Sequence, residues 1–332
     1  MGERLVNVVV ASPLHQDALE LIKAVRGINL VQVSPLIVAE KKGDGAAGAQ
    51  LDSILAHAEV LYGWIHHLPA KVATRAPKLK WLQVTSAGVD RLPKEILQSQ
   101  VIVTNVSGIH ATPISEFVLY LMLSAVKQAP LCFQMKQEKR WQRLHPTTLR
   151  SKTVGIVGLG SIGREIARLS KAFGLRVIGT RRSARKEGRA RYVDTVVPRE
   201  QLGHLLSESD FVVLALPLTP ETDKLIGEKE LRGMRPGAYL INISRGAIVD
   251  EEALIRALEE KWIAGAGLDV FTTEPLSSES KIWELPNVIF SPHISGEMEN
   301  YEIRATEVFC KNLRLYVEGR KFPRVVDPKK GY

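Results

Sequence analysis

The chain has 332 residues, of which 45% are hydrophobic and 24% charged, a composition typical of a folded protein with two domains of ordinary size. This composition excludes disordered and fibrous classes, and the longest strongly apolar run, 117–126, is shorter than the roughly 20 residues that span a bilayer. The formal net charge is +9, but the basic residues are mostly scattered and form no regular stripe, so we expect neither a nucleic-acid partner nor a membrane partner.

Cysteine usage points to a reducing compartment. Only Cys132 and Cys310 are present, and neither belongs to a cluster with metal-ligand spacing. Met1 is followed by charged and polar residues rather than by a secretory pattern. We therefore expect a cytoplasmic protein without a bound metal.

The first third of the chain alternates short β-branched runs with helical stretches. This alternation predicts a parallel sheet with helices on both faces. The expected strands are 6–11, 30–33, 60–64, 81–84 and 101–105. Two helices, 115–128 and 131–144, are expected to follow without a flexible linker.

A second α/β series follows these helices, and a final helix, 298–318, is expected to return to the first domain. The series is long enough for a complete dinucleotide-binding sheet. Its six expected strands are 154–157, 176–180, 211–216, 238–243, 265–270 and 288–290.

The first strand of the second series runs into a Gly-x-Gly-x-x-Gly turn and then into an expected helix, 164–173. In such turns the first glycine permits a tight bend, the second allows the backbone to approach a phosphate, and the third packs the helix on the strand. Backbone N–H groups at the start of the helix then face the anion. The predicted pyrophosphate site comprises Gly158, Gly160, Ser161, Ile162 and Gly163.

Three later strands end in unusual polar residues, namely Arg245, Asp269 with Glu274, and His293. Ligands bind outside the carboxyl ends of strands in open α/β sheets, so these side chains are expected to converge. An arginine can grip a carboxylate, a histidine can pass a proton near neutral pH, and a carboxylate can orient the ring. Taken alone, a histidine of this kind is more often structural and a single Arg or Glu at a strand end is usually part of a surface ion pair, but their shared location downstream of the glycine turn favours a functional set. The pair His66 and His67 has no third ligand at metal-binding spacing and is interpreted as two loop histidines.

Over nearly its full length the chain resembles the D-isomer-specific 2-hydroxyacid dehydrogenase family. The resemblance rests on five ordered motifs: V-G-L-G-S-I-G at 157–163, L-P-L-T-P-E-T at 216–222, N-I-S-R-G at 242–246, G-L-D-V-F-T-T-E-P at 267–275 and S-P-H-I-S-G at 291–296. It implies an α/β fold of two doubly wound parallel-sheet domains. A Rossmann cofactor domain, 104–293, would be inserted in a flavodoxin-like substrate domain formed by 1–103 and 294–332.

The resemblance also assigns roles to residues. It implies Arg245, Glu274 and His293 as the catalytic set, and backbone N–H groups of Ala87 and Gly88 as the site for the substrate carboxylate, with Arg245 and His293 also contacting substrate. Asp269 resembles the residue that contacts the nicotinamide carboxamide. Further cofactor contacts are implied at Pro217, Thr222, Ile243 and Gly296.

The implied reaction is hydride transfer between a nicotinamide cofactor and a small 2-oxo or 2-hydroxy acid of D configuration, most often in the direction of 2-oxo acid reduction. His293 would supply the proton, Glu274 would keep the imidazolium available, and Arg245 would hold the acid. Closure of the cleft between the domains would exclude water.

One departure from the family pattern concerns the cofactor. NAD-using members carry an acidic residue after the second strand, roughly 20 residues beyond the glycine turn. This chain has Arg181, Arg182 and Ser183 there, and guanidinium groups can hold a 2′-phosphate. We therefore expect NADP(H) to be preferred, with NAD(H) as the alternative if these arginines belong only to a solvated basic surface.

Two other functions stay open at this level. One is a relative that oxidises another small acid such as phosphite or formate, although Glu274 argues against the formate branch, which pairs the histidine with Gln. The other is a corepressor-like protein that senses nucleotides on the same fold. Trp64 is a candidate for the substrate side, and Trp141 could reach a neighbouring site in a family-like homodimer. Glyoxylate, hydroxypyruvate and larger 2-oxo acids are all compatible substrates.

Overall fold

The computed structural model of the protein describes residues 5–327, and it divides the chain into two compact units. Unit 1 comprises the residues up to Ile109 together with those from Met298, and unit 2 comprises His110–Glu297. The predicted domain boundaries, 103/104 and 293/294, lie a few residues earlier in the chain than these divisions. The predicted ranges also include 1–4 and 328–332, which lie outside the described residues.

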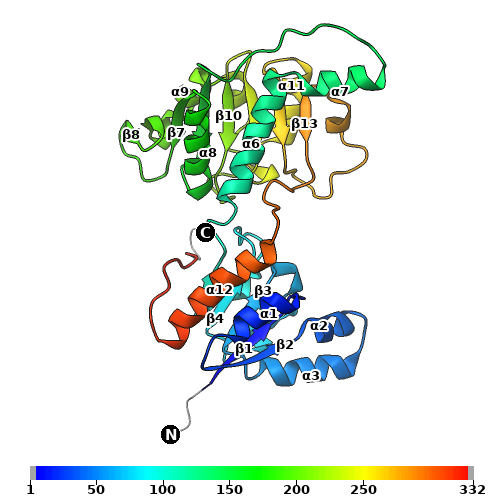
Figure 1. The fold of residues 1–332 in the computed structure, drawn as a ribbon, viewed down its shortest axis with the longest axis vertical. Coiled ribbons are helices and arrows are strands. Elements are labelled where there is room, and N and C mark those ends of the chain that lie inside the picture. Colours follow the sequence, from blue (N-terminus) through cyan, green and yellow to red (C-terminus); the bar gives the residue numbers. More distant parts are fainter. Residues whose placement is uncertain (1–4, 328–332) are drawn as a thin grey trace. The chain divides into compact units, whose positions relative to one another are not determined.

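Unit 1 is built on a five-stranded parallel sheet with the order β2-β1-β3-β4-β5 (Figure 1). This is the flavodoxin-like strand order. Its strands are β1 (Val6–Val10), β2 (Ile28–Gln32), β3 (Val60–Gly63), β4 (Trp81–Val84) and β5 (Ile102–Thr104). Its helices are α1 (Gln16–Lys23), α2 (Ser34–Lys41), α3 (Gly45–Leu55), α4 (Val72–Arg75), α5 (Lys94–Leu97) and α12 (Tyr301–Val317), with a 3₁₀ turn, η1, at Ile65–His67.

Both faces of this sheet are covered, which explains why its central strands are nearly continuous apolar runs. On one face α1 and α12 pack together, and the sheet residues Val8 and Tyr62 meet Ile22 and Phe309 there. The ring of Tyr62 stacks on that of Phe309 with centroids 4.1 Å apart. On the other face α2 to α5 bury a separate apolar cluster.

Unit 2 is built on an eight-stranded sheet with the order β13-β12-β11-β10-β6-β7-β9-β8. Seven strands are parallel, and only the edge strand β8 is antiparallel to its neighbour. The strands are β6 (Thr153–Val157), β7 (Arg176–Thr180), β8 (Gly188–Ala190), β9 (Val193–Val197), β10 (Phe211–Leu214), β11 (Tyr239–Asn242), β12 (Gly265–Leu268) and β13 (Val288–Phe290). The order reverses beside β6, which defines the switch point of a Rossmann sheet.

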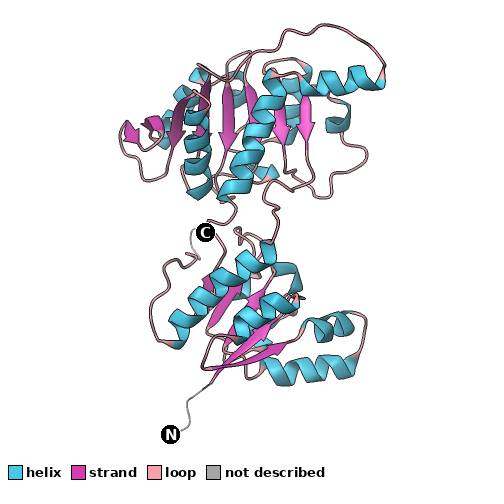
Figure 2. Ribbon diagram, in the orientation of Figure 1, coloured by secondary structure: helices cyan, strands magenta, loops and turns pink. Residues whose placement is uncertain are grey.

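Helices cover both faces of this sheet as well, so the magenta strands of Figure 2 lie between cyan helices. One face carries α6 (Ala111–Val126) and α8 (Ser161–Ala172). The other face carries α9 (Leu202–Glu208), α10 (Glu228–Arg232) and α11 (Glu251–Glu259). The remaining elements are α7 (Ala129–Gln137) and the 3₁₀ turns η2 (Arg199–Gln201), η3 (Gly246–Ile248) and η4 (Lys281–Glu284).

The predicted α/β class with two doubly wound parallel sheets is confirmed, but the structure departs from the local expectations in two places. The hairpin of β8 and β9 was not expected. The helix expected over 131–144 ends at Gln137, because Lys139 takes a left-handed φ of 52° and the amide of Arg140 turns back to the carbonyl of Met135 at 2.9 Å. This 6→1 bond is the C-terminal closure that ends many helices.

Within the described residues, no single helix has both the length and the apolar composition needed to cross a membrane. The pair α6 and α7 meets these criteria only when the two are taken together, and they are bent by 65° relative to each other. Half of the residues of α6 are buried in the core of unit 2.

Candidate active site

The glycine turn between β6 and α8 has the local geometry that a phosphate site requires. Gly158 has a φ of +110°, and a Cβ there would lie 2.3 Å from the carbonyl oxygen of Ala215. At Gly163 a Cβ would lie 2.0 Å from the carbonyl oxygen of Gly158. A Cβ at Gly160, by contrast, would meet no described atom within 4 Å. Two glycines are thus required by packing, whereas Gly160 keeps an open approach to the amino end of α8, where a dinucleotide pyrophosphate fits.

Arg181, Arg182 and Ser183 lie exposed in the turn that follows β7. The amides of Gly158 and Leu159 donate to the carbonyl of Thr180 at 3.2 and 2.9 Å, which fixes the end of β7 beside the glycine turn. The amide of Ala184 closes the turn by donating to the carbonyl of Arg181 at 3.0 Å. Two guanidinium side chains therefore emerge from the segment next to the phosphate-binding turn.

Two further segments at this edge of the sheet are braced by hydroxyl groups. The hydroxyl of Thr222 donates to the carbonyl of Pro217 at 2.7 Å and accepts from the amide of Thr219 at 2.7 Å. The hydroxyl of Ser244 donates to the carbonyl of Leu214 and accepts from the amide of Leu216 at 3.2 Å. These bonds hold the segments that carry the predicted cofactor residues Pro217, Thr222 and Ile243.

The structure brings His293 and Glu274 together. Nδ1 of His293 lies 2.9 Å from Oε2 of Glu274, and the other carboxylate oxygen accepts the amide of Phe271 at 3.1 Å. The histidine side chain is 44% exposed, whereas that of Glu274 is 19% exposed. A carboxylate at Nδ1 assigns a proton to that nitrogen in the neutral ring, which leaves Nε2 as the atom that exchanges a proton with a ligand.

Asp269 holds the segment that carries His293. It is fully buried, and one carboxylate oxygen accepts from the hydroxyl of Ser291 at 2.7 Å and from the amide of Ile294 at 2.9 Å. The other oxygen accepts from the amide of Ser295 at 3.0 Å, and the Asp269 carbonyl accepts from the amide of His293 at 2.8 Å. His293 itself has a φ of 56°, an uncommon value for a residue with a side chain. These bonds support the turn that presents the histidine.

Arg245 follows β11, the strand beside β12, and reaches the same edge of the sheet. Asn242 fixes its backbone, since its side chain donates to the carbonyl of Arg245 at 2.9 Å and accepts from the amide of Ser244 at 3.1 Å. The neighbouring Gly246 packs directly on the segment that leads to Glu274, because a Cβ there would lie 1.9 Å from the carbonyl carbon of Phe271. The arginine and glutamate segments are thus in backbone contact.

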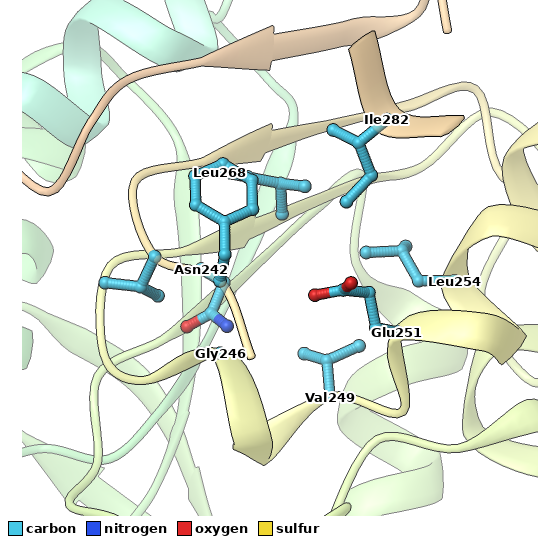
Figure 3. Close-up of a pocket in the computed structure, with 9 residues that line it drawn as sticks. Asn242, Gly246, Val249, Glu251, Leu254, Leu268 and Ile282 are labelled. Carbon is cyan, nitrogen blue, oxygen red and sulfur yellow. The ribbon is translucent and has the colours of Figure 1, made fainter. Parts of the chain in front are cut away.

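A small pocket lies behind this contact, between β11, β12, η4 and the start of α11 (Figure 3). Most of its walls are apolar, and its polar side chains are Asn242 and Glu251. The carboxylate of Glu251 accepts the amide of Thr272 at 3.1 Å, which ties α11 to the segment that carries Glu274. No predicted site residue lines the pocket within the described part of the chain. Its polar side chains, Asn242 and Glu251, instead hold the segments that carry Arg245 and Glu274.

The predicted substrate residues in unit 1 lie at the carboxyl edge of its own sheet. Trp64 follows β3 and is 44% exposed, and its amide donates to the hydroxyl of Ser12 at 2.7 Å. Ala87 and Gly88 lie in the loop that follows β4, and both are half-buried. His66 and His67 lie in η1 beside Trp64. Between residues 5 and 327, no group of three or more His, Cys, Asp or Glu side chains is arranged to hold a metal ion.

Sequence reasoning did not identify Asn242, Glu251 and Ser291, although each holds a predicted site residue or its segment in place. Asn242 and Ser291 fall inside the quoted motifs, so their polar character at buried strand ends was a usable signal. Glu251 lies outside them, in the first turn of α11. An acidic residue there is typical of any helix start, so nothing in the sequence marked it.

Comparison with known proteins is consistent with this geometry. Residues 119–295 match the family described as D-isomer specific 2-hydroxyacid dehydrogenase, NAD binding domain. Glyoxylate reductase of Thermococcus litoralis is 38% identical over 266 residues, which cover 76% of this chain and 78% of the relative. Glyoxylate reductase of Korarchaeum cryptofilum is 36% identical over 267 residues, with 78% and 80% covered.

Two solved structures are similar to the whole chain. A D-isomer specific 2-hydroxyacid dehydrogenase from Xanthobacter autotrophicus, in complex with NADPH and MES, has a TM-score of 0.81 and 30% identity and covers 99% of this chain and 100% of its own. An NADPH-dependent glyoxylate/hydroxypyruvate reductase from Sinorhizobium meliloti, in complex with NADP and sulfate, has a TM-score of 0.82 and 27% identity, with 98% and 100% covered.

The Rossmann sheet, the glycine turn and the paired histidine and glutamate define an NAD(P)-dependent oxidoreductase. The chain belongs to the D-isomer specific 2-hydroxyacid dehydrogenase family, as its motifs predicted. It transfers hydride between NADP(H) and a 2-oxo or 2-hydroxy acid. The reductase names of the relatives favour this activity over the nucleotide-sensing alternative.

Proposed function

We propose that this protein reduces glyoxylate to glycolate and closely related small 2-oxo acids to D-2-hydroxy acids, with NADPH as the preferred reductant. The observation that carries the catalytic part is the 2.9 Å contact between Nδ1 of His293 and Oε2 of Glu274 at the carboxyl edge of the Rossmann sheet. The names of the relatives from Thermococcus litoralis and Sinorhizobium meliloti support the substrate class.

The residues of the chain divide the chemistry between them. When bound, the reduced nicotinamide supplies the hydride. Nε2 of protonated His293 donates a proton to the oxygen of the reacting carbonyl, and the Glu274 carboxylate stabilises the imidazolium that makes this donation. Arg245 pairs with the substrate carboxylate and the carbonyl oxygen and so orients the reacting carbon. The amides of Ala87 and Gly88 donate to the same carboxylate.

The cofactor residues follow from the same edge of the sheet. The open backbone at Gly160 and the amides of Ser161 and Ile162 receive the pyrophosphate, and Arg181, Arg182 and Ser183 receive the 2′-phosphate. Pro217, Thr222, Ile243, Asp269 and Gly296 complete the predicted cofactor contacts. Of these, the carboxylate of Asp269 already accepts three hydrogen bonds from its own chain. It therefore holds the His293 loop in addition to any contact that it makes with the cofactor.

The experiment for the reaction follows absorbance of the reduced nicotinamide with glyoxylate, hydroxypyruvate and larger 2-oxo acids, each with NADPH and with NADH. Turnover of glyoxylate with NADPH at a higher kcat/KM than with NADH is the expected result. No oxidation of either cofactor with any of these acids would overturn the proposed function. Faster turnover with NADH would overturn only the cofactor preference.

Variants locate the 2′-phosphate site. Arg181→Ala and Arg182→Ala are expected to raise the KM for NADPH by about tenfold each, since a charge-assisted contact contributes roughly 1.5 kcal/mol, and to leave the KM for NADH unchanged. Arg189→Ala is the control, because Arg189 is an exposed arginine on β8 outside the predicted site. Equal increases in the KM for NADPH and the KM for NADH would show that these arginines do not bind the 2′-phosphate.

We further propose a homodimer in which α7 and the segment after it contact a second copy. Trp141 is fully exposed and Phe133 is 66% exposed, which makes them the two most exposed large apolar side chains of the described residues, and both lie in or just after α7. Light scattering should give twice the mass of the 36.8 kDa chain, and Phe133→Ser with Trp141→Ser should give the monomer mass. A monomeric parent protein would contradict this.

The free cysteines Cys132 and Cys310 support a reducing, cytoplasmic location.

A further inference from the structure

The loop that follows β4 in unit 1, residues 85–90, holds four successive carbonyls in hydrogen bonds. The carbonyl of Thr85 accepts from the hydroxyl of Tyr301, and that of Gly88 accepts from the hydroxyl of Ser86 at 2.8 Å. The carbonyl of Ser86 accepts from the amide of Val106 at 3.5 Å. The carbonyl of Ala87 accepts from the side-chain amide of Asn105 at 2.7 Å. The four carbonyls of residues 85–88 therefore point at protein donors.

The amides of the same stretch behave differently. In the part of the chain that the structure describes, the amides of Ala87 and Gly88 donate to no protein acceptor. A trans peptide unit is planar, and its C=O and N–H groups point in opposite directions. A donor that holds the carbonyl of Ala87 therefore also aims the amide of Gly88 away from that donor. The carbonyl of Ser86 is related to the amide of Ala87 in the same way.

Asn105 is itself fixed. Its carbonyl oxygen accepts the amide of Ser107 at 3.1 Å, so the NH₂ group of the side chain must face Ala87. The residue follows β5, the strand that pairs with β4, and Gln83 of β4 lies opposite Thr104 of β5. Strand pairing thus brings Asn105 beside the loop, and its two hydrogen bonds leave one orientation for the amide.

We propose that Asn105 is a positioning residue for the substrate carboxylate site: it holds the Ala87–Gly88 peptide so that the amide of Gly88 is presented as an anion donor. The proposal rests on the proposed function, which assigns the amides of Ala87 and Gly88 to the carboxylate of the 2-oxo acid. Backbone donors that are fixed before binding lose little entropy when the anion arrives. The role of Asn105 is therefore in acid binding, and proton and hydride transfer belong to unit 2.

The test compares Asn105→Asp with Asn7→Asp. The aspartate at 105 can still accept the amide of Ser107 but cannot donate to Ala87. Asn7 is the matched control, because its side chain also donates to a main-chain carbonyl, that of His57 at 3.1 Å, and accepts from Asn29. Asn7 lies near the amino end of β1, whereas Asn105 follows the carboxyl end of β5. Asn105→Ala removes the donor without adding a charge.

Glyoxylate, its neutral methyl ester and NADPH are the probes. We expect both variants at 105 to raise the KM for glyoxylate by about tenfold, the effect of weakening one hydrogen bond to a charged group. The KM for NADPH should stay within about twofold of the parent, and the preference for glyoxylate over the ester should fall. Asn7→Asp should match the parent in all three measurements.

Two results separate the possible failures. If the parent protein reduces glyoxylate and the variants at 105 keep the KM and the acid preference of Asn7→Asp, the positioning role is wrong and the proposed function stands. Equal losses with acid and ester in both variants would likewise overturn it, because Asn105 would then act on the fold as a whole. If the parent reduces no 2-oxo acid, the proposed function itself fails. Thermal unfolding of each variant identifies any loss of fold.

Discussion

The contact between His293 and Glu274 joins two residues that are nineteen positions apart and lie on segments following different strands. Two features support it: Gly246 allows the Glu274 segment to lie against the Arg245 segment, and the carboxylate of Asp269 holds the turn of His293. The side chains of His293 and Glu274 are themselves 44% and 19% exposed. They are held in place by residues behind them, of which Asp269 is fully buried.

Replacing Glu274 by Gln removes the negative charge beside the histidine and keeps the size of the side chain. We expect kcat for 2-oxo acid reduction to fall about 100-fold, within the usual range for general acid catalysis. Steady-state rates at saturating glyoxylate and NADPH measure this. Glu251→Gln is the matched control, because that carboxylate also accepts a loop amide but, within residues 5–327, makes no hydrogen bond or ion pair with the histidine. Equal losses in the two variants would refute the charge argument.

Replacing Asp269 by Asn places an NH₂ group where two acceptor oxygens now serve three donors. One buried amide or hydroxyl loses its acceptor, so we expect the free energy of unfolding to fall by about 2 kcal/mol. Urea titration followed by fluorescence measures this. Ser291→Ala deletes only one of the three bonds and should cost about 1 kcal/mol. An Asp269→Asn protein as stable as the parent would show that the loop does not depend on the carboxylate.

At the scale of elements, two glycines of the turn have different roles: Gly163 is required by packing, and Gly160 leaves space for a ligand. Gly163→Ala forces a Cβ to 2.0 Å from the carbonyl oxygen of Gly158, whereas Gly160→Ala meets open space at an ordinary φ of −76°. We expect Gly163→Ala to lower stability by about 2 kcal/mol through strain. Gly160→Ala should keep the stability of the parent and weaken NADPH binding by tenfold or more, because the methyl group occupies the phosphate approach.

Thermal melts without cofactor and fluorescence titration with NADPH distinguish the two glycine variants. An unchanged NADPH affinity in Gly160→Ala would show that the cofactor pyrophosphate does not bind at this turn. An unchanged melting temperature in Gly163→Ala would instead show that α8 can shift to admit a Cβ.

The central strands of both sheets could be predicted from sequence because strands buried on two faces are continuous apolar runs. The hairpin strand β8 could not, since its three residues, Gly188 to Ala190, are all exposed and carry no such pattern. The carboxyl-end side chains Arg245, Glu274 and His293 were marked by motif. The residues that hold these side chains in place were not predicted. A bond such as that between Ser291 and Asp269 joins residues 22 positions apart and depends on the pairing of strands.

At the scale of the whole molecule, acid stability is expected to depend on His110, the residue before α6. Burial lowers the pKa of His110 from 6.5 to about 4 in the folded protein. In the unfolded chain the ring regains its ordinary pKa, so between these values the unfolded state binds a proton that the folded state does not. This residue therefore contributes stability above pH 6.5, and that contribution is lost as the pH falls toward 4.

His110→Gln removes this proton linkage. The difference in unfolding free energy between parent and variant should change by up to about 1.4 kcal/mol per pH unit between pH 6.5 and 4 and should be constant outside this window. Urea titrations at a series of pH values measure it, with His145→Gln as the control because His145 is exposed. The contributions of carboxylates cancel in the difference. A difference that is constant across the window would show that His110 accepts its proton in the folded protein as readily as in the unfolded chain.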